Sequence, residues 1–437
     1  MSTTQTSTPR SSKRQSHAAS LVSDGFLRDL MAAGQADILI GLPTHNDAAT
    51  AGRVARTVHE LFTRVYARRR TVLLHLDGGS TDDSTQVVAT SGVATRDSSI
   101  ASFSLRTQHL ISAPYHAVSG RGHALRLVFT AADLLDVRAI AVLSPDACEL
   151  SVDDLARLLQ PVLEAGKDYV KPIVPRAAHE GPLVTQLVRP LLGTIFGQRL
   201  LEPVDRLLAC SPAFARKALK TPLWDTQFAQ YGPDPWLGAL AALEGFALAQ
   251  AHVHAQTGAP RGQFADLFRQ ITGSSLNVIT HEAARWRAIT EIRDVPSFGA
   301  PSSAVDAGAP AFDVASAHLA FRQGLDDLQP LLSEILPPEL LAALRAADCG
   351  ETVALDDALW VRTVYAFVSS AARRSFPLDQ IAQALQPIYL GRLCCWLGCL
   401  SAAQSSAAAE ALHRGLAAEF ESHRPEFVAA WPMSDAG

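Results

Sequence analysis

Between residues 36 and 288, short apolar runs alternate with longer stretches that have helical spacing. The apolar runs with the length of strands are Asp37–Leu42, Thr71–Leu76, His109–Ser112 and Arg138–Leu143. Parallel strands are buried on both faces and therefore appear as nearly continuous apolar runs, with helices as the crossovers between them. The alternation predicts an α/β domain with a mainly parallel sheet.

Three of these runs are followed by polar loops: Pro43–Asp47, Asp77–Asp82 and Ser144–Asp146. The carboxyl ends of parallel strands meet at one edge of a sheet, where ligands bind in open α/β folds. A glycine such as Gly78 lets the backbone approach a ligand closely, and a carboxylate accepts hydrogen bonds from a base or a ribose. Turns also favour Asp for local reasons, so Asp77 either contacts such a ligand or forms its own turn.

Composition excludes several classes of protein. Hydrophobic residues make up 48% of the 437 residues and charged residues 19%, which excludes global disorder. A net charge of −5 argues against binding nucleic acid through bulk phosphate neutralisation. The sequence has no uninterrupted apolar run long enough for a membrane span. Six cysteines are too few for a chain of this length to depend on disulfide bonds, so we expect a reducing compartment, the cytoplasm.

The chain is expected to have four parts. Residues 1–20 form a Ser/Thr/Gln-rich tail without the apolar core of a signal peptide. The α/β domain spans residues 21–295, and residues 296–310, rich in Gly, Pro, Ser and Ala, form a linker. Residues 311–437 have a helical pattern throughout, which predicts a helical subdomain through which the chain could form a homo-oligomer.

The first two polar loops resemble motifs of a known family. One contains Pro43, Asn46 and Asp47, and the other begins Asp77-Gly78-Gly79-Ser80, one βαβ unit later. In this order they resemble the loops of nucleotide-sugar-dependent glycosyltransferases of the GT-A fold, particularly the family 2-like group. The resemblance implies a nucleotide-sugar donor bound by Pro43, Asn46, Asp47, Asp77 and Gly78.

Further segments resemble the same family. Gly120-Arg121-Gly122 looks like a basic segment near the donor diphosphate, and Arg is a bidentate phosphate ligand, although Arg121 could also be a solvated loop charge. Tyr169–Pro172 and Gly181–Leu192, the latter with Thr185 as a retained substrate-binding residue, are similar to a narrower branch. That branch contains glucosyl-3-phosphoglycerate synthases, mannosylglycerate synthases and bacterial relatives. The resemblance covers roughly residues 36–290.

Asp234 stands where the family has an acidic residue near the acceptor hydroxyl. The resemblance therefore implies that Asp234 acts as the catalytic base or orients the acceptor. Asp234 lies between two prolines, so it could equally cap a helix that begins near Trp236.

The sequence departs from the family at the metal site. The family usually has Asp-x-Asp after the fourth strand, where carboxylates hold Mg²⁺ or Mn²⁺ against the donor diphosphate. Here this segment is Ser144-Pro145-Asp146, so Asp146 alone remains as a metal ligand, unless it caps the next helix. A more distal metal-binding histidine aligns with Gly258, or with His254 if a small gap is allowed. His252 and His254 share a face of a strand, which without a third ligand is weak evidence for a metal.

The acceptor loop has also changed. Pro203–Leu207 carries bulky side chains, Arg206 among them, where the family has glycines, and Leu183 replaces the arginine of phosphoglycerate-specific members. Two hypotheses follow. Either the chain transfers a sugar from a UDP- or GDP-sugar to a hydroxyl of a small-molecule or glycan acceptor, with retention implied by the branch, or it is a degenerate relative that acts as a nucleotide-sugar sensor or a scaffold.

Overall fold

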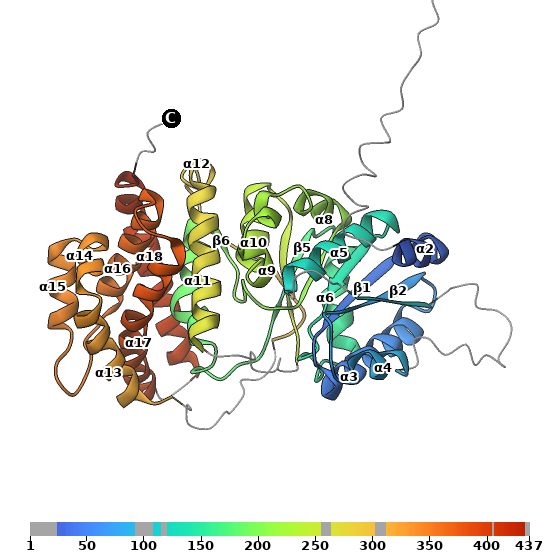
Figure 1. Cartoon of the computed structure of the whole chain (residues 1–437), viewed down its shortest axis with the longest axis horizontal. Helices are drawn as coiled ribbons and strands as arrows, with labels where there is room; N and C mark the ends of the chain where they lie inside the picture. Colours follow the sequence, from blue (N-terminus) through green and yellow to red (C-terminus); the bar gives the residue numbers. More distant parts are fainter. Residues whose placement is uncertain are drawn as a thin grey trace, which may run out of the picture.

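The computed structural model describes residues 24–91, 108–114, 120–254, 264–301, 312–403 and 406–432. An α/β part and a group of helices lie side by side, with α11 (Phe264–His281) between them (Figure 1). The predicted tail, residues 1–20, and residues 302–310 of the predicted linker lie outside the described residues.

The α/β part is built on an eight-stranded sheet of order β10-β8-β5-β7-β4-β1-β2-β3, in which β7 alone of the described strands runs antiparallel to its neighbours. The strands are β1 (Ile38–Thr44), β2 (Thr71–Asp77), β3 (Gln108–Pro114), β4 (Ala139–Val142), β5 (Tyr169–Ile173), β7 (Leu208–Cys210), β8 (Leu248–His252) and β10 (Ser297–Phe298). The predicted mainly parallel sheet is confirmed, and the arrangement is consistent with a GT-A fold. Ser297 and Phe298, which the predicted linker includes, belong to the edge of this sheet.

Both faces of the sheet are covered, because side chains of each strand alternate between two cores. In β1, Leu39 packs into one core while Ile38 and Ile40 pack into the other. The second core contains residues of α3 (Ala48–Glu60), η1 (Leu61–Val65), α4 (Ser84–Ala89) and α6 (Val152–Glu164). The first core receives α2 (Asp24–Ala33), α5 (Arg121–Leu134), η2 (Val184–Val188), α7 (Arg189–Phe196), α8 (Pro212–Ala218), η3 (Pro222–Asp225) and α10 (Asp234–Leu243).

The predicted helical C-terminal region is confirmed. Its helices are α13 (Val314–Asp327), α14 (Gln329–Ile335), α15 (Pro338–Ala346), α16 (Asp357–Arg373), α17 (Leu378–Ala402) and α18 (Ser406–Ala429). The remaining short elements are β6 (Gln198–Arg199), which pairs with β9 (Arg293–Asp294), and the helices α9 (Phe228–Tyr231) and α12 (Ala283–Trp286). Whether the chain forms a homo-oligomer through the C-terminal helices stays a prediction.

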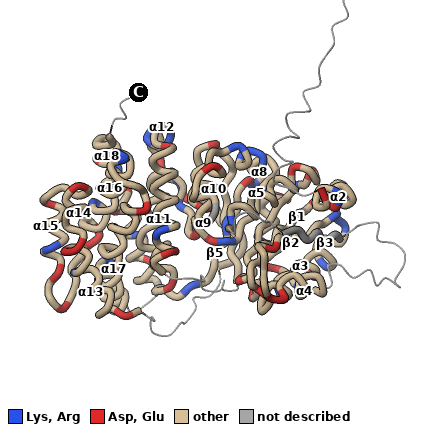
Figure 2. The backbone as a smooth tube through the Cα atoms, in the orientation of Figure 1, with Lys and Arg blue, Asp and Glu red and all other residues tan. Residues whose placement is uncertain are grey.

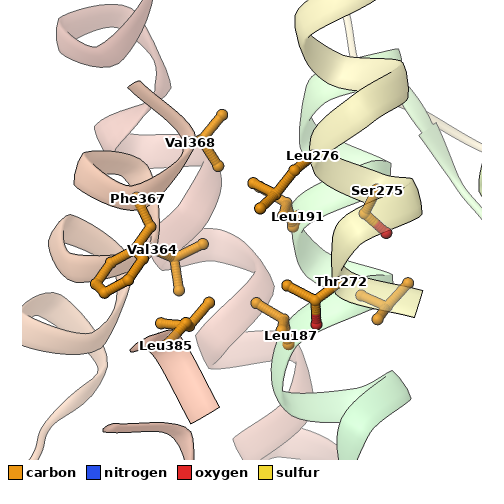
Figure 3. Close-up of a pocket in the computed structure, with 10 residues that line it drawn as sticks. Leu187, Leu191, Thr272, Ser275, Leu276, Val364, Phe367, Val368 and Leu385 are labelled. Atoms are coloured by element: carbon orange, nitrogen blue, oxygen red, sulfur yellow. The ribbon is translucent and has the colours of Figure 1, made fainter. Parts of the chain in front are cut away.

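The C-terminal helices share the first core with the α/β part. Leu191 of α7, Leu276 of α11 and Val364 of α16 line a cavity of only about 10 Å³ at the junction (Figure 3). The indole N–H of Trp360 in α16 donates to the backbone carbonyl of Gln186 at 2.8 Å. Because close packing leaves almost no void here, we expect the two parts to unfold together.

Two further observations concern the distribution of charge and the hydropathy of the helices. Basic and acidic residues are interspersed along the described helices and strands (Figure 2). Within the described ranges, every helix is too short or too polar to cross a membrane.

Candidate functional site

The loops after β1 and β2 are joined into one unit. Thr44 and Asp77 are partners at the ends of the paired strands. Beyond them, the backbone of Asn46 adopts a left-handed conformation, with φ of 57°. Its N–H donates to Ser80 Oγ at 2.9 Å, and its side-chain Oδ1 accepts from the Thr81 N–H at 2.8 Å. The predicted donor-binding residues of the two loops are therefore brought together at the carboxyl edge of the sheet.

Asp77 forms its own turn. Its Oδ2 accepts the backbone N–H groups of Gly79 and Ser80 at 3.1 and 3.0 Å, and its Oδ1 accepts the Ser80 hydroxyl at 2.6 Å. Partial burial alone would raise the pKa of Asp77, but these hydrogen bonds bring it below its usual value. Gly78 donates its N–H to the carbonyl of Thr44. Asp77 therefore stabilises its own turn, as one of the two alternatives predicted, and its contact with a nucleotide stays a prediction.

Asp47 lies at the start of α3 and is held by the chain itself. Its N–H donates to Ser84 Oγ at 2.7 Å, and its Oδ2 accepts the His45 N–H at 2.8 Å. Pro43 lies within β1 and is partly exposed at the same edge. These residues shape the loop, and a direct contact with a ligand stays a prediction for both.

A buried histidine lies next to these loops. His75 of β2 is fully buried, and a hydrogen bond of 2.8 Å joins its Nε2 to Thr44 Oγ1. Burial lowers the pKa of His75 to about 4, although the nearby Asp77 charge opposes this. His75 is therefore neutral around neutral pH.

Two predicted site residues, Arg121 and Asp234, bind each other. The Nε and Nη2 groups of Arg121 donate to the two carboxylate oxygens of Asp234, each at 3.1 Å. Lys171 of β5, whose side chain is fully buried, donates its Nζ to Asp234 Oδ1 at 3.2 Å. Burial alone would raise the pKa of Asp234, but the charges of Arg121 and Lys171 bring it below its usual value.

This pairing bears on the predicted role of Asp234. The N-cap of α10 is Pro233 and Asp234 is the first residue within the helix, so the alternative of a helix cap is wrong. Because both its oxygens are bonded to cations and it is buried, it is poorly suited to accept a proton. Whether Asp234 acts as the base or orients the acceptor stays a prediction.

The ion pairs continue into the acceptor loop. Lys171 also donates its Nζ to the backbone carbonyl of Asp205, and Asp205 Oδ1 accepts the Leu207 N–H at 2.7 Å. Arg176 Nη2 lies 3.6 Å from Asp205 Oδ2. Arg176 also donates to both carboxylate oxygens of Glu202, at 2.9 and 3.0 Å. Burial raises the pKa of Glu202 to about 7, against the opposing charge of Arg176. The bulky loop is thus fixed by charged contacts instead of being open.

Asp146 forms an ion pair with Arg206, one of the residues that depart from the family motif. Arg206 Nη1 donates to Asp146 Oδ2 at 2.6 Å, and the Ser144 hydroxyl donates to the same oxygen at 3.4 Å. The alternative that Asp146 caps the next helix is wrong, because Ser151 is the N-cap of α6 and forms a capping box with Asp154. Ser144 and Arg206, which both depart from the family motif, therefore contact the same oxygen of Asp146.

A cleft of about 560 Å³ lies beyond the carboxyl ends of β4 and β5. Both the charged residues just described and apolar residues line it. The polar lining includes Asp146, Arg176, Glu202, Asp205 and Arg206, and the apolar lining includes Val174, Pro182, Leu183, Val184, Phe264, Leu267 and Ile271. This cleft has a size and a mixed lining typical of small-molecule sites.

The residues of this site do not fit the divalent cation that the family resemblance implies. Among the described residues, no cluster of three or more His, Cys, Asp or Glu side chains could hold a metal. Asp146 is the one carboxylate of the former motif, and Arg206 already neutralises it. At about 4 Å and an effective dielectric constant of about 20, a divalent ion beside the guanidinium would meet a repulsion of about 8 kcal/mol.

Of the two positions considered for the distal histidine, His254 alone lies among the described residues. Gly258 lies outside the described residues. His254 Nδ1 instead lies 3.2 Å from Asp154 Oδ1 and 2.6 Å from Arg157 Nη1. His254 therefore belongs to a local polar cluster at the start of α6.

Thr185 lies in η2, one residue beyond the segment that lines the cleft. Its hydroxyl is buried without a hydrogen-bond partner among the described residues. Gly120 precedes α5 with extended backbone, so it positions Arg121 at the helix start. Contact of either Thr185 or Gly120 with a substrate stays a prediction.

Sequence reasoning did not identify Lys171, Arg176 and Glu202 as members of the site. Lys171 gave a usable signal, because a lysine inside an apolar strand is almost never fully buried unless it is paired. Arg176 and Glu202 lie in loops, and their pairing depends on a fold that brings together residues 26 positions apart.

Neither a family model nor a curated protein sequence matches this chain. Solved structures of glucosyl-3-phosphoglycerate synthase from Mycobacterium tuberculosis are similar to it. A complex with Mn²⁺, UDP and glucosyl-3-phosphoglycerate is 22% identical, with 60% of this chain and 84% of that chain covered and a TM-score of 0.39. A complex with Mg²⁺ and UDP is 21% identical, with coverages of 61% and 84% and a TM-score of 0.37.

These structures belong to the glycosyltransferase branch whose motifs the sequence resembles.

Proposed function

We propose that this chain transfers a sugar from a UDP- or GDP-linked donor to a hydroxyl group of a small-molecule or glycan acceptor. The observation that carries the proposal is the joining of the β1 and β2 loops, with their donor-binding motifs, at the same sheet edge as the arginine-lined cleft. In open α/β sheets this edge is the usual place for a nucleotide.

The donor would lie along this edge. Its base and ribose would contact the loops of Asn46 and Asp77, and its diphosphate would point toward the cleft after β4. In the reaction, the bond between the anomeric carbon and the diphosphate oxygen breaks, the acceptor oxygen bonds to that carbon, and the hydroxyl proton passes to an oxygen of the departing diphosphate. A fixed positive charge that faces the departing diphosphate lowers the barrier, as does positioning of the hydroxyl. The resemblance favours retention of the anomeric configuration.

In this mechanism, Asp234 is a positioning residue. It holds Arg121 and Lys171, and Lys171 holds the backbone of the acceptor loop at Asp205. Substitution of Asp234 would therefore disturb the loop through Lys171.

The acceptor differs from that of the solved relatives. Leu183 and Val184 face the cleft with Leu267 and Ile271 of α11, and Phe264 adds an exposed ring. These apolar side chains favour an acceptor with an apolar portion.

A nucleotide-sugar sensor is a second candidate, and one observation favours it. Both acidic residues that the resemblance places near the reacting groups, Asp146 and Asp234, are bound in ion pairs. A protein that only binds a donor needs neither a free base nor a metal.

The test is calorimetric titration with UDP, GDP and UDP-glucose, followed by chromatography of donor incubated with hydroxyl acceptors. Binding with release of UDP or GDP and a new glycoside would support the transferase. Binding without any release would favour the sensor, and the absence of nucleotide binding would refute both. Asp77→Asn should weaken nucleotide binding about tenfold, the effect of losing one charge-assisted contact. Asp294 is an exposed carboxylate of β9, so Asp294→Asn is the matched control and should leave nucleotide binding unchanged.

A further inference from the structure

We infer that Arg206 replaces the divalent cation, so that its guanidinium faces the donor diphosphate and nucleotide binding needs no metal. The inference rests on the proposed function, and it assigns to Arg206 a role that the motif resemblance does not supply.

Charge balance is the first argument. A divalent cation on two carboxylates gives a net charge of zero, and so does one arginine on one carboxylate. Here Ser144 removes one negative charge from the motif, and Arg206 brings a single positive charge to the remaining Asp146 at 2.6 Å. Counted over Ser144, Asp146 and Arg206, the two changes therefore compensate each other in charge.

Rigid placement is the second argument. Residues on both sides of Arg206 are fixed: Asp205 accepts Lys171 Nζ at its carbonyl, and its Oδ1 accepts the N–H of the fully buried Leu207 at 2.7 Å. Ion pairing with Asp146 then fixes the side chain. A charge that is already in place when the ligand arrives loses little conformational entropy on binding.

Availability of hydrogen-bond donors is the third argument. Arg206 has 40% of its side chain exposed and lines the cleft, while Arg121 has 15% and Arg176 28%. Arg121 uses two groups on Asp234, and Arg176 uses two on Glu202. Among the described residues, Arg206 bonds only to Asp146, through one nitrogen, so its other N–H groups remain for an anion.

The experiment measures binding of UDP and of uridine by calorimetry, each with EDTA and with Mn²⁺. Wild type, Arg206→Gln and the control Arg345→Gln are compared. Arg345 is a suitable control because 39% of its side chain is exposed, it forms an ion pair of 3.2 Å with Asp326, and neither residue lines the cleft. Circular dichroism of each variant establishes that it is folded.

We expect wild type to bind UDP equally well with EDTA and with Mn²⁺. Arg206→Gln should weaken UDP binding about tenfold or more, as for loss of a charge-assisted contact, and leave uridine binding unchanged. Arg345→Gln should bind as wild type does.

Other outcomes separate this inference from the proposed function. UDP binding by wild type that requires Mn²⁺ would overturn the inference and leave the proposed function intact, and this result does not depend on any variant. An unchanged UDP affinity in folded Arg206→Gln would also overturn it. A wild-type chain that binds neither ligand would refute the proposed function itself.

Discussion

Replacing Asp234 by Asn tests whether this carboxylate is a structural anchor. In the wild type it accepts three charge-assisted hydrogen bonds of 3.1–3.2 Å from Arg121 and Lys171. The side chain of Lys171 is 0% exposed and that of Arg121 is 15% exposed, so neither cation can recover full hydration when the partner charge is lost. Breaking a buried pair in this way costs about 3–5 kcal/mol.

Urea unfolding followed by circular dichroism measures this cost. Asp294→Asn is the matched control, because Asp294 pairs with Arg199 at 3.0 Å but is 85% exposed, and an exposed pair contributes less than about 1 kcal/mol. We expect Asp234→Asn to lose several kcal/mol of unfolding free energy and the control to lose almost none. An Asp234→Asn protein as stable as wild type that binds donor but cannot turn it over would refute the structural interpretation and restore Asp234 as the base.

Three further predictions concern buried residues. Burial lowers the pKa of His75 from 6.5 to about 4, so below pH 6.5 the unfolded chain binds a proton that the folded protein does not, and stability is lost as the pH falls toward 4. Urea unfolding at about pH 5 and about pH 7 should show that His75→Gln removes about 2 kcal/mol of this difference, and an unchanged difference would contradict the assignment. A Cβ on Gly122 would lie 1.4 Å from the carbonyl oxygen of Ala229, so Gly122→Ala should cost about 3 kcal/mol or more in thermal unfolding, and a variant as stable as wild type would contradict the close approach. Leu276→Ala should cost about 2–5 kcal/mol in a single calorimetric transition, because the junction core is shared, and two separate transitions would show that the parts unfold independently.

Much of the fold could be predicted because its signals are local. The apolar runs that became β1, β2 and β4 are buried on both faces, so nearly every residue in them is apolar and the pattern is clear. β7 has only three residues and runs antiparallel, and β10 has two, so neither contains enough residues to show a period. The pairing of Ser297 with Gln250 depends on the course of the chain, which local composition does not encode.

The site was predictable only in part. The positions of Asn46, Asp77 and Asp146 at strand ends followed from the alternation of strands and helices. Their partners did not, because Arg206 lies 60 residues from Asp146, and Arg121 lies 113 residues from Asp234. Long-range ion pairs like these depend on tertiary structure.

A crystal structure with UDP in the absence of divalent metal tests the central claim most directly. We predict uridine against the loops after β1 and β2, and the diphosphate within hydrogen-bonding distance of the Arg206 guanidinium. A nucleotide in the separate cavity between α7 and α18, near Arg189 and Arg414, would contradict the account.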